Sequence, residues 1–291
     1  MKTATESPAS LIKNHLVDSH LHLVNLDRFH YYWMKPEFSV LQHNYLAEDV
    51  HPLYEACNVD QAVLVQAHPS REETRYLVEV ANRYRFVGAA VAHIDLTAET
   101  IEQDLAELSR SGIIRAVRHQ QAEDQPGDWF LGPEVLRGLR AVSAVGLSYD
   151  LLVKPRHLPS IPVIMEKVPD LKIVLEHMGK PPIASGSLRP WAEDLAAIAE
   201  NPAVCCKISE LVTQADWERW SNEDLKPYVQ HALKCFGPDR LMWGSGWPVC
   251  LLAADFGQTL SSSLEALGPL SEPEIDRIFR ENARAFYDLD T

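Results

Sequence analysis

The sequence is poor in cysteine. Five cysteines occur in 291 residues, and no two of them form a C-x-x-C pair. They are Cys57, Cys205, Cys206, Cys235 and Cys250. An odd set without paired spacing indicates neither a disulfide framework nor a zinc knuckle, so we expect a reducing intracellular compartment, the cytoplasm.

Positive charge is also scarce, because 27 lysines and arginines stand against 41 aspartates and glutamates, a formal net charge of −14. Nucleic acids and anionic membranes are polyanions, so we expect neither as a partner. A small anionic substrate responds to local charge and is not excluded. No run of 18 apolar residues occurs, and residues 1–14 lack the apolar segment of a signal peptide. The composition, 46% hydrophobic and 23% charged, is typical of a soluble globular protein.

The chain also lacks internal repeats, low-complexity linkers and a glycine-rich first loop. Instead, short apolar segments of strand length alternate with longer amphipathic segments. The expected strands are residues 15–21, 61–67, 86–92, 113–119, 147–153, 172–178, 203–209 and 240–246. Eight strand-then-helix units at a spacing of roughly 30 residues predict an α/β fold, one (β/α)₈ TIM barrel domain over residues 1–291. The alternative is a doubly wound open sheet, which usually has a glycine-rich first loop. The oligomeric state stays open.

Helix boundary signals fit this alternation. Two capping boxes, Ser70 with Glu73 and Ser271 with Glu274, predict helix starts. Gly237 is the expected C-cap of the helix before the eighth strand. Residues 24–46 are rich in aromatic side chains and predict a loop insertion after the first strand.

Two histidines lie one residue apart at the end of the first expected strand, in HLVDSHLHLV. Chance alone gives about 0.5 such pairs in a chain of this composition, so their position must decide their role. Functional side chains gather at the C-terminal strand ends of a barrel, and strand geometry points His20 and His22 to one side. His177 closes the sixth expected strand, and imidazole is a usual zinc ligand. Metal binding and a role as hydrogen-bonding side chains both stay open for these histidines.

Polar residues also stand at other strand ends. An arginine there suits a carboxylate or a developing oxyanion through its bidentate guanidinium group. The alternative is that Arg118 only pairs with Asp150 as a structural ion pair. Residues of the first loop either line a substrate wall or pack as an ordinary loop. The expected catalytic residues are His119, Arg118 and Asp150, and the expected substrate-binding residues are Trp33, Arg28, Gln66 and Lys207.

Six segments, in order, resemble one known family. They are VDSHLHL, LVQAHPSREETRYL, AVRHQ, IVLEHMGKPP, CCKISELVT and RLMWGSGWPV. Together they are similar to the sugar-lactonase branch of the amidohydrolase superfamily, with its L-fuconolactonase- and L-rhamnonolactonase-like members, over about residues 17 to 288. The resemblance implies a TIM barrel in which water opens a sugar-derived or small carboxylated lactone, an enzyme of carbohydrate metabolism.

By matching motif, the resemblance implies that His20, His22 and His177 form the metal site. It also implies that Arg118 and His119 contact the lactone carbonyl or a carboxylate. The bridging carboxylated lysine of the superfamily is not visible at the fourth strand, and no histidine ends the fifth. The cofactor prediction is therefore one divalent ion, with zinc favoured, or no metal, because some relatives of this branch work without one.

The eighth strand departs from the family pattern. The resemblance implies an aspartate as general base in Trp/Phe-Gly-Ser-Asp-Trp-Pro, but here the run is WGSGWP and the residue is Gly246. Three explanations stay open: an engineered change, a natural loss of hydrolysis that leaves a ligand-binding barrel, or another base such as Asp150, His119 or His177. A decarboxylase, another lyase or an isomerase of the superfamily is the alternative function. The sequence alone predicts that Gly246→Asp speeds hydrolysis about 10²–10⁴-fold.

Overall fold

The computed structural model describes residues 14–289. The segment in which we expect no signal peptide, residues 1–14, lies outside the described residues except for Asn14. Eight parallel strands pair in the order β1 to β8. Their bounds are β1 Leu16–Leu21, β2 Val59–Val65, β3 Val87–His93, β4 Ile114–Arg118, β5 Ser148–Leu151, β6 Ile173–Leu175, β7 Val204–Ile208 and β8 Leu241–Trp243. All eight expected strands are present, and the (β/α)₈ barrel is confirmed.

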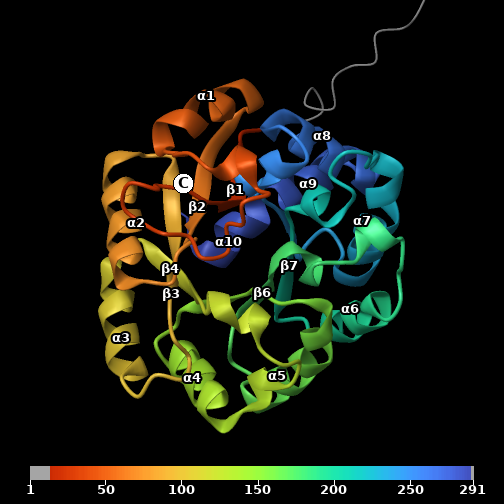
Figure 1. The fold of residues 1–291 in the computed structure, drawn as a ribbon. Coiled ribbons are helices and arrows are strands. Elements are labelled where there is room, and N and C mark those ends of the chain that lie inside the picture. The colour runs from red at the N-terminus through yellow and green to blue at the C-terminus, as the bar shows by residue number, and fades with distance from the viewer. Residues whose placement is uncertain (1–13, 290–291) are drawn as a thin grey trace, which may run out of the picture.

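Helices alternate with the strands and surround them (Figure 1). They are α1 Ala47–Cys57, α2 Arg71–Arg83, α3 Ile101–Leu108, α4 Pro133–Ala144, α5 Ile161–Lys167, α6 Trp191–Ala199, α7 Asn222–Phe236, α8 Phe256–Leu267, α9 Glu272–Asp276 and α10 Asn282–Tyr287. Within residues 14–289, no helix has the length and apolar character needed to cross a bilayer. All five cysteines are free thiols.

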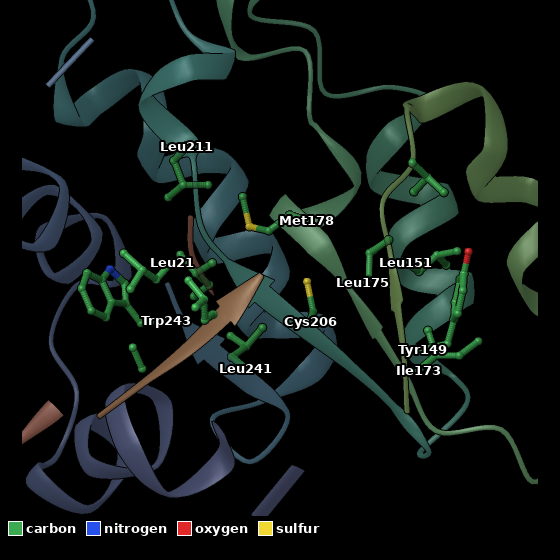
Figure 2. Packing of buried hydrophobic residues seen from close by; sticks show 14 of the residues in the cluster. Leu21, Tyr149, Leu151, Ile173, Leu175, Met178, Cys206, Leu211, Leu241 and Trp243 are labelled. Atoms are coloured by element: carbon green, nitrogen blue, oxygen red, sulfur yellow. The ribbon is translucent and has the colours of Figure 1, made fainter. Parts of the chain in front are cut away.

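Successive residues of each strand face opposite sides of the barrel wall. Val63, Val174 and Met242 belong to the cluster that fills the interior. Leu175 and Leu241 belong to the larger cluster that includes residues of the surrounding helices; Figure 2 shows both among the packed side chains of that cluster. Both faces are therefore buried, which explains why the strands read as nearly continuous apolar runs in the sequence.

Backbone hydrogen bonds beyond the strand ends join β1 to the segment after β8. The Gly246 amide donates to the His20 carbonyl, and the His22 amide donates to the Trp247 carbonyl, each at 2.8 Å. A buried carboxylate adds to this seam, because Asp18 accepts hydrogen bonds from the Ser245 amide at 2.8 Å and from the Tyr54 hydroxyl at 2.9 Å. The first histidine pair and position 246 are thus held side by side.

Two of the helix boundary signals have the expected geometry, and one differs. Gly237 caps α7 with φ +66°, and the Glu274 carboxylate accepts from the Ser271 amide at 2.8 Å. Ser70 accepts from the Glu73 amide at 3.1 Å, as expected for a cap. The Glu73 carboxylate, however, accepts from the amides of Ala67 and His68, at 2.9 and 2.6 Å, instead of reaching back to Ser70. It therefore fixes the backbone that follows β2.

Glu73→Gln should make stability less sensitive to pH. Burial raises the pKa of Glu73 from 4.5 to about 8. A carboxyl whose folded pKa lies above its unfolded pKa stabilises the fold most at low pH, and this contribution is lost as pH rises from about 4.5 to about 8. The melting temperature of the wild type should thus fall more between pH 5 and pH 9 than that of the glutamine variant. Parallel curves for the two proteins would contradict this.

The expected insertion after β1 folds back on itself. The amide and carbonyl of Val24 exchange hydrogen bonds with those of Tyr45, at 2.9 and 2.7 Å. Between these residues the chain forms turns and one short 3₁₀ helix, Ser39–Leu41. The Trp33 indole donates to the Ala67 carbonyl at 2.7 Å, which ties the insertion to the end of β2. The loop is thereby placed over the barrel mouth.

Candidate active site

The strand ends open into a cavity of about 480 Å³. Its aromatic lining is Tyr32, Trp33, Phe38 and Trp217. Its charged and amide side chains include Lys35, Gln120, Glu123, Asp124, Lys154, Lys180 and Gln214. Its buried polar residues are His22, Arg118, Gln120, His177 and Glu210. A concave site with aromatic walls and a few buried polar groups is the usual form of a small-molecule site.

The three expected histidines come together. The Nε2 atoms of His20 and His22 lie 3.0 Å apart, and the rings of His20 and His177 have centroids 4.6 Å apart. All three side chains are buried. A register irregularity between Asp18 and Leu21 accompanies the turn of His20 toward the interior. Residues far apart in the sequence therefore share one place at the barrel mouth.

His177 reaches this place from a turn and not from a strand. β6 ends at Leu175, and the following 3₁₀ turn, Glu176–Gly179, gives His177 a φ of +52°. The Ser209 hydroxyl, just past β7, lies 2.8 Å from His177 Nδ1. The sixth strand is therefore shorter than the sequence predicts, and left-handed backbone geometry sets the direction of the imidazole.

The histidines are neutral in this environment. Burial lowers the pKa of His22 to about 3, and it lowers the pKa values of His20 and His177 well below the usual value. His22 Nδ1 lies 2.7 Å from the Val65 carbonyl, which can only accept, so this nitrogen carries the proton. His22 Nε2 therefore carries a lone pair, which faces His20 Nε2 at 3.0 Å and suits a metal ion placed between the two rings.

Below the histidines lies a buried network of charges. Lys207 donates to Asp150 at 2.6 Å and lies 3.8 Å from Glu176. The Tyr287 hydroxyl donates to Asp150 at 2.7 Å, and Lys207 Nζ lies 3.2 Å from His20 Nδ1. Asp150 and Lys207 are fully buried and are not among the lining residues of the cavity. Both residues lie behind the histidines inside the barrel, and the roles of Asp150 in catalysis and of Lys207 in substrate binding stay predictions.

Arg118 both lines the cavity and takes part in the network. It donates to the Glu176 carboxylate at 2.8 Å and to the Gln66 carbonyl. Its ion-pair partner is thus Glu176 and not Asp150, the partner considered from the sequence. The Gln66 side chain is buried and is not among the residues that line the cavity. The contact of Gln66 with Arg118 is made by its backbone carbonyl.

Arg28 and His119, two further expected site residues, do not line the cavity among the described residues. Arg28 donates to Glu79 at 2.9 Å on the outside of the barrel. His119 Nδ1 accepts from the Leu96 amide at 3.1 Å. Each side chain is held by a local partner from the second or third strand-to-helix region, and a role of these two residues in the site stays a prediction.

The place expected for the eighth-strand base contains Glu210. β8 ends at Trp243, and Gly246 lies beyond it with φ +64°. A Cβ atom at Gly246 would lie 2.3 Å from Glu210 Cγ. Glu210 Oε2 lies 3.6 Å from His177 Nε2, and burial raises the pKa of Glu210 to about 7. Sequence reasoning missed this residue, although an acidic residue directly after the seventh strand was a visible signal.

The donor atoms of the site suit a divalent cation. Two groups of ligand atoms gather within 4.8 Å, His20 with His22 and Glu210, and His20 with Glu176 and His177. Two nitrogens bound to one tetrahedral zinc lie roughly 3.3 Å apart, close to the 3.0 Å between the Nε2 atoms of His20 and His22. Glu176 Oε1 is buried without a hydrogen-bond partner, so it is a further oxygen atom that a cation at this place could use. The residues therefore fit a zinc-like ion.

Comparisons with known proteins identify the family of this chain. The family model described as amidohydrolase matches residues 17–289. The chain is 34% identical to L-fucono-1,5-lactonase of Burkholderia ambifaria over 281 residues, 94% of this chain and 96% of the relative. It is 36% identical to L-fucono-1,5-lactonase of Burkholderia multivorans over 255 residues, 84% of this chain and 86% of the relative.

A solved structure gives the same result. The crystal structure of an amidohydrolase from Burkholderia multivorans with bound zinc has a TM-score of 0.88 and 33% identity to this chain. The match covers 95% of this chain and all of that chain (100%). The resemblance carried by the six sequence segments is confirmed, and this chain belongs to the amidohydrolase family.

Proposed function

We propose that this chain hydrolyses a sugar-derived 1,5-lactone, with L-fucono-1,5-lactone as the first candidate. The observation that carries the proposal is the gathering of His22, His177, Arg118 and Glu210 at one end of the cavity. Identity of 34% and 36% to two L-fucono-1,5-lactonases supports this substrate class. The mixed aromatic and polar wall suits a sugar, which has apolar faces and hydroxyl edges.

The site contains the groups that lactone hydrolysis needs. Arg118 is a permanent cation beside the cavity, so it can stabilise the negative charge that develops on the carbonyl oxygen. The Glu210 carboxylate lines the cavity and is available to accept the proton of the attacking water. Trp33 and Trp217 can hold the sugar ring, which reduces the entropy cost of the attack.

A divalent ion is part of this proposal. His20, His22 and His177 would hold it, since their neutral rings converge and imidazole is a good zinc ligand. When bound, such an ion supplies Lewis-acid polarisation of the lactone carbonyl. Lys207 and Glu176, which lie beside His20 Nδ1 at 3.2 and 3.4 Å, would then orient the ring from behind.

Acid release at constant pH, measured across a panel of sugar lactones, tests the proposal. We expect turnover of L-fucono-1,5-lactone, with weaker turnover of its mirror image and of five-membered lactones. Release of carbon dioxide from carboxylated aromatic acids would instead indicate a decarboxylase. Tight binding of a lactone without acid release would indicate a ligand-binding barrel. Either result would contradict the proposal.

A further inference from the structure

Glu210 occupies a strained backbone position at the mouth of the barrel. It directly follows Ser209, past the end of β7, and has φ +52°, in the left-handed region that is unfavourable for an L-residue. Non-glycine residues held in this region gather at functional sites. The side chain lines the cavity, although only 7% of the residue is exposed. The fold thus holds a carboxylate at this place at a cost.

Gly246 provides the space for this carboxylate. An ideal Cβ at Gly246 would lie 2.3 Å from Glu210 Cγ and 3.2 Å from Glu210 Oε1. Real Cβ atoms do not approach carbon this closely, so any side chain at position 246 would displace Glu210. Side chains from the two positions therefore compete for one place, and glycine at 246 is a condition for the observed arrangement.

The Glu210 carboxylate also differs from its buried acidic neighbours in its partners. Arg118 binds Glu176, and Lys207 binds Asp150, so these two carboxylates are already occupied. No described residue donates a hydrogen bond to the Glu210 side chain. Its oxygens lie 3.9 Å from His22 Nε2 and 3.6 Å from His177 Nε2. It is an acceptor placed next to the histidines and open to the cavity.

We infer that Glu210 is the catalytic proton acceptor of this site, supplied from the end of β7, and that Gly246 is retained to make room for it. This inference rests on the proposed lactone hydrolysis. As the water oxygen bonds to the carbonyl carbon, one water proton moves to a Glu210 oxygen. When the bond between the carbonyl carbon and the ring oxygen breaks, that proton passes to the leaving ring oxygen. The product is a hydroxy acid, and Glu210 returns as a carboxylate.

Glu210→Gln is the first test, because the amide keeps the shape and loses the basicity. We expect kcat/KM for L-fucono-1,5-lactone to fall about 10²–10⁴-fold with kcat carrying the loss. The melting temperature should be unchanged. Affinity for zinc alone should change less than about tenfold, because Glu210 is neither a metal ligand nor a partner of one in this inference. Losing a hydrogen-bond partner of a metal ligand typically costs 10–100-fold in metal affinity. Glu218→Gln, an exposed substitution eight residues on, is the matched control and should keep full activity.

Three outcomes separate the claims. A wild type without lactonase activity contradicts the proposed function itself. An active wild type whose Glu210→Gln variant stays within about tenfold contradicts the inference alone. A loss of zinc affinity greater than about tenfold in that variant would make Glu210 part of the metal site and overturn its role as proton acceptor.

Moving the carboxylate from position 210 to position 246 tests whether the two side chains compete for the same space. Gly246→Asp alone should slow the enzyme, because the new side chain pushes Glu210 aside; this reverses the gain that the sequence alone predicts. Glu210→Gly should be slow for lack of a carboxylate. The double variant Glu210→Gly/Gly246→Asp should recover at least about tenfold over Glu210→Gly. A folded double variant without recovery, or a tenfold gain from Gly246→Asp alone, would contradict the inference.

Discussion

Replacing Lys207 with methionine should lower the free energy of unfolding by about 3–5 kcal/mol. Lys207 is fully buried and lies 2.6 Å from Asp150 and 3.8 Å from Glu176. Its removal leaves the buried Asp150 carboxylate without its cation and takes from Glu176 one of its two neighbouring cations, which is costly because charge is poorly solvated inside a protein. Denaturation with urea measures the loss directly.

A double variant provides the control for Lys207. Lys207→Met/Asp150→Leu removes both partners of the 2.6 Å pair, so it should regain much of the lost stability. The melting temperature of the double variant should therefore exceed that of Lys207→Met. A single variant that loses less than about 1 kcal/mol would show that the network is not the support we describe.

Replacing Arg118 with alanine should weaken binding of the hydroxy-acid product by about 2–5 kcal/mol. Only 2% of Arg118 is exposed, and the residue lines the cavity. A product carboxylate bound beside its guanidinium group would therefore form an ion pair with little water around it. The variant also leaves Glu176 without its 2.8 Å partner, so stability should fall as well. Calorimetric titration with the product and thermal melts separate the two effects.

Arg118→Ala/Glu176→Gln separates these two roles further. The neutral amide removes the unpaired charge, so the double variant should regain stability over Arg118→Ala. Product affinity should stay low, since the buried guanidinium group that lines the cavity is still missing. Product affinity equal to that of the wild type in both variants would make Arg118 a structural residue only.

The period of the hydrophobic pattern predicted the barrel well, and it failed at the ends of the short strands. β6 and β8 were expected to reach residues 178 and 246, but they end at Leu175 and Trp243. His177 and Gly246 then lie in turns with positive φ. Apolar periodicity reports burial, and these turns are buried too, so the sequence pattern continues past the last strand hydrogen bond.

The side-chain partners in the site could not be predicted from spacing. Glu210 and Gly246 meet because the segment after β8 returns beside β1 and β7, which is a consequence of barrel closure. Arg28 lies in a long insertion, where the sequence does not determine which face a side chain takes. The approach of His20 to His22 was predictable, because strand alternation points two side chains one residue apart to the same side of a barrel strand end. The direction of His177 was not, because a turn with positive φ sets it.

The most direct measurement of the central claim is acid release from L-fucono-1,5-lactone by the wild type and by His20→Ala/His22→Ala, at matched folded fraction. The account predicts that the wild type releases acid far above the uncatalysed rate and that the double variant loses at least about 10²-fold in kcat/KM. A folded double variant as fast as the wild type, or a wild type no faster than buffer, would contradict lactone hydrolysis at this site.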